Sequence, residues 1–260
     1  MSEAAHEVPN ITCIPRINTR QRQENMAAAF KLDPPRLRMT PIVQTKSLAI
    51  VGGGPSLKDT WQDINNYDTV MSCGSTHDHL TGIGVHSDYH LECDPDIPQV
   101  KYYQSIKFDC TYLIASRCHP SMFKRLKNRD IKLWHMWEDD IGLEPYRKEP
   151  AVRGAISCVL CALATAIAMG FQDIHFFGFD SSFAHEAAHH AYPCEERDQV
   201  IKTRVGDPDK GTIFLTTPTW IAQARTFVQM QDQWEHMLKA TVHGYSLMWE
   251  TQKQRGLAYV

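Results

Sequence analysis

The sequence predicts an α/β protein with a Rossmann-like, open and mostly parallel sheet that carries helices on both faces. From residue 46 onward, short apolar segments rich in β-branched residues alternate with helical segments. Strands that are separated by helices pair in parallel through right-handed crossovers. The first such segment, SLAIV, stops at three glycines, and a helical pattern follows. A strand, a glycine turn and a helix N-terminus together suit a nucleotide phosphate.

Each element is predicted from its local pattern. Strands are expected at 48–51, 69–73, 86–92, 111–115, 131–134, 174–177 and 212–216. Helices are expected from Leu57, from Ser121, over 155–169 and over 219–237, and a last apolar piece over 245–249. The 155–169 segment is rich in Ala and Cys and has no polar face, so we expect it to lie flat against the sheet. It should end at Gly170.

The chain divides into an extension and one domain. Residues 1–45 form a basic N-terminal arm, and residues 46–260 form a single nucleotide-binding domain with a lid-like insertion at about 183–211. The basic residues of the arm are Arg16, Arg20, Arg22, Lys31, Arg36 and Arg38. They either grip a phosphate or a partner, or belong to an extension that is solvated or packs on the body.

Composition narrows the function classes. A net charge of −3 gives no overall field for nucleic acid. No apolar run reaches the ~20 residues of a membrane span, and the first residues lack a signal-peptide pattern, so a cytoplasmic location is expected. Eight cysteines without a framework spacing predict reduced core thiols. Cys158 and Cys161 form a C-x-x-C without a second pair.

The glycine turn is the first candidate binding element. Gly52, Gly53 and Gly54 permit positive φ and a close approach of backbone N–H groups to a ligand. Pro55 fits the first helical position, and Ser56 brings an oxygen into the first turn. The turn is neither the G-x-G-x-x-G fingerprint nor a P-loop.

Polar residues follow the other predicted strands as well. In an open parallel sheet the ligand sits beyond the carboxyl ends of the strands. These residues therefore predict a binding crevice on one rim, and they include Gly74, Ser75, Asp94, Arg117, Asp180 and Ser181.

The segment FAHEAAHHAYPC adds histidines to this rim. His185 and His189 are four residues apart, and HEAAH comes close to the H-E-x-x-H zinc pattern. The alternatives are a mobile loop over the crevice, whose histidines titrate near neutral pH and act as general acid or base, and simple solvent-exposed histidines.

Three blocks carry a resemblance to a known family. VGGGPSLKD, HSDYHLECDPD and VRGAISCVLCALATAIAMGFQDIHFFGFDSS resemble the MptE-like family, which includes 6-hydroxymethylpterin diphosphokinases and motility-associated factors. The same blocks look like the sialyltransferases of glycosyltransferase family 42. The resemblance spans about residues 46–190, with a weaker echo in VHGYSLM.

The resemblance implies roles for matching residues. The glycine turn would bind the donor nucleotide, the region of Gly154 would approach it, and His190 or His189 would be the general base. Gly53 stands where the sialyltransferases have an asparagine. Asp94 stands near the position of a second asparagine of that family. Asp94 and Asp180 would suit a Mg²⁺–triphosphate better, as a diphosphokinase needs.

We therefore expect a nucleotide-dependent transferase, in first place a sialyltransferase-like glycosyltransferase that moves a sugar from a nucleotide-sugar to an acceptor hydroxyl. Arg117 or Arg153 would stabilise the leaving group. The alternative enzyme is a Mg²⁺-dependent diphosphokinase that uses ATP. If the chain is not an enzyme, the alternative is a non-catalytic nucleotide-binding module. The expected partners are the nucleotide, the hydroxyl acceptor and a second copy of the chain.

Overall fold

A seven-stranded parallel sheet forms the centre of the computed structural model, which describes residues 17–184, 189–193, 199–207 and 209–257. The strand order is β11-β8-β1-β2-β3-β4-β5, and every neighbouring pair is parallel. The strands are β1 (Ser47–Val51), β2 (Thr69–Cys73), β3 (Tyr89–Glu92), β4 (Thr111–Ala115), β5 (Asp130–Trp134), β8 (Asp173–Phe177) and β11 (Lys239–Val242). The predicted fold class is confirmed.

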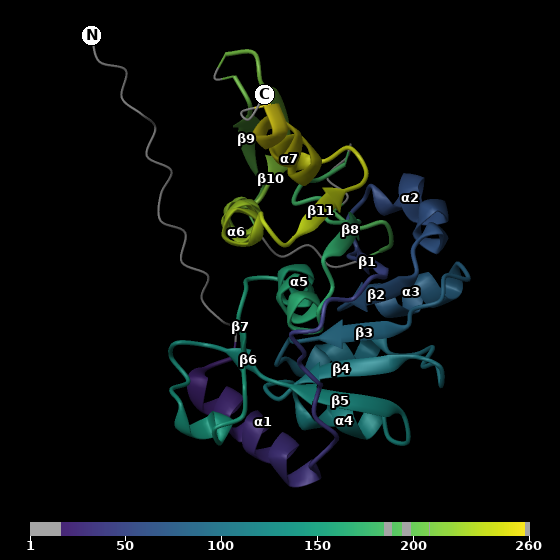
Figure 1. Cartoon of the computed structure of the whole chain (residues 1–260), viewed down its shortest axis with the longest axis vertical. Coiled ribbons are helices and arrows are strands. Elements are labelled where there is room, and N and C mark those ends of the chain that lie inside the picture. The colour runs from purple at the N-terminus through teal and green to yellow at the C-terminus, as the bar shows by residue number, and fades with distance from the viewer. Residues whose placement is uncertain (1–16, 185–188, 194–198, 208, 258–260) are drawn as a thin grey trace.

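The path of the chain places a switch point at β1. The chain builds β1 to β5 outward in one direction, then returns to lay β8 and finally β11 on the other side of β1 (Figure 1). Ligands of such sheets bind beyond the carboxyl ends of the strands at the point where the order reverses. Here that point lies between the ends of β1 and β8.

Alternate residues of β1 enter two different cores. Leu48 and Ile50 belong to the larger core, which also holds the buried residues of α5 (Cys158–Ala168). Ala49 and Val51 face the smaller core with Leu57, Ile64 and Leu80. Because both faces are covered, the strand reads as a continuous apolar run, which is why its bounds can be predicted closely.

Helices cover both faces of the sheet. In Figure 1, α5 lies on one side, and α2 (Leu57–Thr60) and α3 (Thr76–Gly82) lie on the other. The remaining helices are α4 (Pro120–Arg125), α6 (Pro218–Trp234) and α7 (Leu247–Leu257), with 3-10 turns η1 (Trp61–Asn66), η2 (Ile97–Tyr102) and η3 (Glu144–Tyr146). Within the described parts of the chain, no helix combines the length and the apolar character that crossing a bilayer requires.

Three predicted helices differ in extent, and one of them, α6, ends at Trp234 rather than at 237. α5 begins at Cys158 rather than at 155, because the Ser157 side chain accepts a hydrogen bond from the backbone N–H of Leu160 at 3.4 Å and caps the helix there. The helix after the glycine turn is a single turn, α2, that continues as η1.

The end of the predicted lid forms the first strand of a hairpin whose second strand follows the lid. β9 (Ile201–Val205) pairs antiparallel with β10 (Thr212–Thr216). Residues 185–188 of the HEAAH segment lie outside the described residues, so the zinc pattern is not tested.

The N-terminal arm packs against the body. α1 (Thr19–Leu32) buries Met26, Ala29 and Phe30. The backbone then runs beside β5, where Leu37 N–H donates to the carbonyl of Leu133 and Leu133 N–H donates to that of Pro35. The arm therefore covers the open edge of the sheet at β5. A small parallel pair, β6 (Met136–Trp137) and β7 (Val152–Arg153), lies next to α1 in Figure 1.

A buried charge network attaches α1. Arg22 is 1% exposed and donates to Glu138 at 3.1 Å and also to Asp140. Arg117 donates to the same Glu138 oxygen at 2.6 Å. Two guanidinium groups thus share one carboxylate, which offsets part of the cost of burying all three charges.

We expect Arg22→Ala to lower the free energy of unfolding by about 3 kcal/mol, because the substitution removes one of the two guanidinium groups that neutralise the buried Glu138 and leaves Glu138 with Arg117 alone. Arg20→Ala is the matched control on the same helix: Arg20 pairs with Glu24, its side chain is 88% exposed, and its loss should cost less than about 1 kcal/mol. Urea unfolding of the two variants checks this, and equal losses would contradict it.

Candidate functional site

The glycine turn after β1 packs against a second turn, Gly178–Asp180, that follows β8. Gly54 N–H donates to the carbonyl of Gly178 at 2.8 Å. A Cβ at Gly52 would lie 2.7 Å from that same carbonyl oxygen, and a Cβ at Gly54 would lie 2.8 Å from it. Two of the three glycines are therefore required by the contact between the two turns.

The predicted reason for these glycines needs correction. None of Gly52, Gly53 and Gly54 has a positive φ, whereas Gly178 does, at 57°. The glycines serve close approach, and at Gly52 and Gly54 the approaching group is the protein's own backbone.

Asp180 holds the end of the glycine turn. One carboxylate oxygen accepts from the backbone N–H of Ser56 and the other from the Ser56 hydroxyl, each at 2.6 Å. Asp180 is 4% exposed. The anion at the start of α2 is thus an internal carboxylate, and Ser56, predicted to bind nucleotide, is engaged with it.

Burial raises the pKa of Asp180 to about 6, although both hydrogen bonds from Ser56 act to lower it. The next residue, Ser181, has a φ of 51°, and its buried hydroxyl has no hydrogen-bond partner in the described structure. The C-terminal segment supports the turn: Met248 N–H donates to the Asp180 carbonyl, and a Cβ at Gly244 would lie 2.5 Å from the Ser56 side chain. The VHGYSLM echo therefore packs on the glycine turn.

Gly53 faces a different neighbour. A Cβ at Gly53 would lie 2.4 Å from the Tyr192 hydroxyl and 2.5 Å from Cδ2 of His190. Ala191 N–H donates to the Gly53 carbonyl at 2.9 Å, and Tyr192 shares a 2.7 Å hydrogen bond with Ser75. The 190–192 segment therefore covers Gly53 and reaches the turn after β2.

His190 is largely buried under this cover. Burial, and then the nearby His189, lower the pKa of His190 to about 4. Its Nδ1 atom is buried without a hydrogen-bond partner in the described structure. The His189 ring lies 4.4 Å from that of His190, in an edge-on arrangement. At neutral pH His190 is an uncharged imidazole that can accept a proton.

The first turn of α5 closes the other side of the site. A Cβ at Gly52 would lie 2.9 Å from Val159, and a Cβ at Gly74 would lie 3.5 Å from the Cys158 sulfur. We call the region formed by Gly53, Ser75, the first turn of α5 and the 190–192 segment the glycine crevice. In Figure 1, α5 lies beside the central strands of the sheet.

Asp94 and Asp180 are not brought together. β3 and β8 are three strand spacings apart, or about 14 Å. The Asp94 oxygens accept from Asp96 N–H and from Gln99. One Mg²⁺ ion, which binds its ligands at about 2 Å, does not reach both carboxylates.

Arg117 and Gly154, both predicted site residues, are engaged with other parts of the protein. Arg117 is 8% exposed and pairs with Glu138. Gly154 packs on β6, where its N–H donates to the Trp137 carbonyl at 3.0 Å and an added Cβ would lie 2.4 Å from that oxygen. Both residues lie on the β6–β7 side of the sheet.

Glu92 and Tyr192 were missed by sequence reasoning. Glu92 ends β3 and is fully buried; burial, and then Asp94, raise its pKa to about 7. It accepts from Tyr103, which contacts His90 at 2.6 Å. A charged residue that ends an apolar strand, as in YHLE, was the available signal for Glu92. For Tyr192, the only signal in the sequence was its position next to the histidines at 189 and 190.

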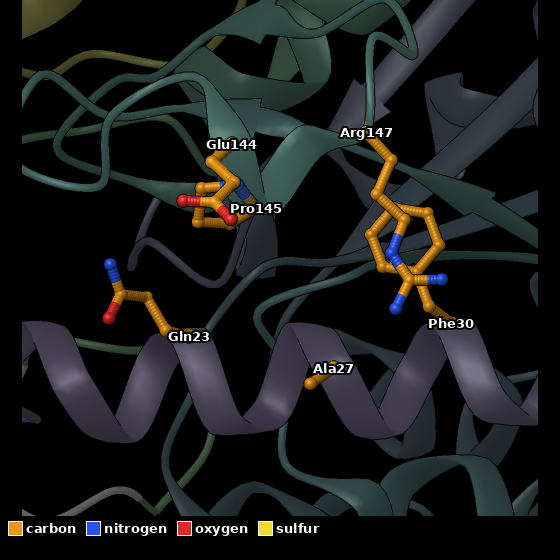
Figure 2. A pocket seen from close by; sticks show the side chains of 6 residues that line it. All are labelled: Gln23, Ala27, Phe30, Glu144, Pro145 and Arg147. Carbon is orange, nitrogen blue, oxygen red and sulfur yellow. The ribbon is translucent and has the colours of Figure 1, made fainter.

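A separate hollow of about 330 Å³ lies between α1 and η3 (Figure 2). The Arg147 guanidinium stands over the Phe30 ring at 4.4 Å from its centroid. This hollow is formed by α1 and η3, and none of the crevice residues lines it.

Comparison with known proteins supports the fold. The MAf glycosyltransferase of Magnetospirillum magneticum AMB-1 matches with a TM-score of 0.66 and 13% identity, over 92% of this chain and 41% of that one. This chain thus spans well under half of that protein. A mammalian sialyltransferase in complex with Gal-beta-1-3GalNAc-ortho-nitrophenol matches with a TM-score of 0.42 and 12% identity, over 68% of this chain and 71% of that one.

Comparison with curated proteins gives no match. The family model described as "6-hydroxymethylpterin diphosphokinase MptE-like" matches residues 23–186. This match covers more than half of the chain, includes most of α1, and contains the glycine turn, β3, α5 and the Gly178–Asp180 turn. The chain therefore belongs to the MptE-like family.

Proposed function

We propose that this chain is a nucleotide-dependent transferase whose donor nucleotide lies in the glycine crevice, along Gly53, Gly74 and Ser75. The observation that carries the proposal is the position of Gly53. Its neighbours Gly52 and Gly54 pack against the Gly178 backbone, whereas the atoms nearest to a Cβ at Gly53 are side-chain atoms of His190 and Tyr192. A ligand phosphate would approach this backbone once these two side chains move aside, without displacing any part of the sheet.

The crevice supplies suitable groups for a phosphate. The first turn of α5 adds backbone N–H groups and the positive end of an 11-residue helix. Ser75 offers a hydroxyl that is now bound to Tyr192. Arg117 is occupied by Glu138, so neutralisation of the leaving phosphate depends on these backbone groups more than on Arg117.

We favour glycosyl transfer over diphosphoryl transfer. His190 would accept the proton of the acceptor hydroxyl while the bond from the sugar to the nucleotide breaks. A diphosphokinase needs oxygen ligands for Mg²⁺, and Asp94 and Asp180 are too far apart to share one ion. The fold that the chain shares with the MAf glycosyltransferase agrees with this choice. More specifically, we propose that the donor is a nucleotide-sugar of the kind that sialyltransferases use.

The reaction is tested by mass spectrometry of products. The full chain is incubated with CMP-, UDP- or GDP-sugars, and separately with ATP, Mg²⁺ and 6-hydroxymethylpterin. Release of the nucleotide from one sugar donor, lost in His190→Asn, supports glycosyl transfer. A pyrophosphorylated pterin would favour the diphosphokinase instead. Binding of a nucleotide without turnover of either kind would favour a non-catalytic module.

Gly53→Ala should abolish nucleotide binding. A bound nucleotide at 100 times its Kd is expected to raise the Tm of the wild type by about 5 °C, and this shift should disappear because the new Cβ occupies the approach to the backbone. Gly82→Ala is the matched control, since a Cβ there meets no atom within 4 Å. A full shift in Gly53→Ala would contradict the proposed position of the nucleotide.

The low pKa of His190 predicts a pH-dependent stability difference. The unfolded histidine binds its proton near pH 6.5, whereas the folded one binds it near 4. The wild type should therefore lose up to about 3 kcal/mol of its free energy of unfolding as the pH falls through this window. The raised pKa of Asp180 acts in the opposite direction, but it is common to variant and wild type, so the difference between them isolates His190.

Urea unfolding between about pH 7 and pH 4.5 measures this difference. The free energy of unfolding of His190→Phe should increase relative to the wild type as the pH falls. His236→Phe serves as the control for the substitution itself, because the His236 side chain is 92% exposed. A pH-independent difference for His190→Phe would show that His190 titrates normally.

A further inference from the structure

Two thiols meet beside the glycine crevice. The Sγ atoms of Cys93 and Cys158 lie 3.2 Å apart, although the residues are 65 positions apart in the sequence. Cys93 follows the end of β3, and Cys158 is the first residue of α5. A disulfide bond has a length of about 2.05 Å, so the two sulfurs need to approach by only about 1 Å.

The two thiols differ in exposure. Cys93 is 8% exposed and sits in the larger core, whereas Cys158 is only partly buried. The Cys158 thiol also contacts a carboxylate oxygen of Glu92 at 3.6 Å, which orients the S–H group. An oxidant from solvent therefore reaches Cys158 first, and the buried Cys93 is placed to react second.

We propose that Cys93 and Cys158 form an oxidisable dithiol pair, in which Cys158 attacks the oxidant and Cys93 resolves the product. With glutathione disulfide, the Cys158 thiolate, after loss of its proton to solvent, attacks one sulfur of the oxidant. A mixed disulfide forms, and one glutathione thiolate leaves. Cys93 loses its proton to solvent, and its thiolate then attacks Sγ of Cys158 and expels the second glutathione as a thiolate. The protein loses two protons and two electrons, and the glutathione disulfide takes them up to become two glutathiones.

The position of the pair links it to the crevice. The Cys158 sulfur lies 3.5 Å from the place of a Cβ at Gly74, and Cys158 begins the helix whose first turn bounds the crevice. A bond from Cys158 to Cys93 would fasten the N-terminus of α5 to the end of β3. The pairing is independent of whether the crevice binds a nucleotide, because it rests on the sulfur positions alone.

A third thiol and a carboxylate define the competing possibilities. Cys161 lies one helical turn after Cys158, and its sulfur contacts Met136 at 3.6 Å. Glu92, Cys93 and Cys158 also present ligand atoms within 4.8 Å of one another, which is compatible with a thiophilic metal ion. The experiment must therefore identify the bonded pair and detect a bound metal.

The full chain is reduced, freed of reductant and incubated with glutathione disulfide at about pH 8.5, where thiolate is available. Intact mass should fall by two hydrogens, and non-reducing peptide mapping should join the peptides of Cys93 and Cys158. Cys93→Ser should instead gain one glutathionyl group on Cys158, because the resolving thiol is missing. Cys158→Ser should yield roughly tenfold less of either product.

Cys110→Ser and Cys161→Ser are the controls, and both should retain the Cys93–Cys158 link. A link from Cys158 to Cys161, or unchanged thiols after oxidation, would overturn the proposal. So would one zinc ion retained in native mass spectrometry of the purified protein and lost in Cys93→Ser, since that result would assign the thiols to a metal.

Discussion

The Asp180 carboxylate binds the backbone and the hydroxyl of Ser56, and this pair of 2.6 Å hydrogen bonds ties the turn after β1 to the turn after β8. The close packing of Gly52 and Gly54 on Gly178 follows from the same contact. Since β1 and β8 are the strands at which the sheet order reverses, the contact determines the shape of the site at its centre.

Because of this constraint, the three glycines of the turn have two different roles. Gly52 and Gly54 are structural, because a side chain at either place would push the two turns apart. Gly53 is left facing the crevice, where His190 and Tyr192 now cover it. The C-terminal segment takes part as well, since Gly244 packs on Ser56 and Met248 binds the Asp180 carbonyl. The site is therefore assembled from both ends of the domain.

The two buried arginines, Arg22 and Arg117, serve the attachment of the N-terminal helix rather than the glycine crevice. The basic residues Arg22 and Arg117 neutralise Glu138 and attach the N-terminal helix to the body. The crevice itself is bounded by glycines, a serine, thiols and the N-terminus of α5, with the neutral imidazole of His190 above it. If the proposed phosphate binds there, the backbone N–H groups at the start of α5 would supply positive potential.

The sequence by itself determined β1, β2, β4, β5 and β8 closely, because a strand that is buried on both faces must be a short apolar run bounded by turn residues. It began β3 at 86 rather than at Tyr89, and it did not predict the partly exposed edge strand β11. It also placed polar residues at the correct rim, since that follows from parallel pairing. It left the partner of each polar residue undetermined. Ser56 and Asp180 are 124 residues apart, and Cys93 and Cys158 are 65 apart. Only the tertiary structure decided that Asp180 supports the glycine turn and that Tyr192 covers Gly53. It also decided that Asp94 and Asp180 lie too far apart to bind one metal ion together. Such contacts depend on how the layers pack rather than on the local sequence pattern.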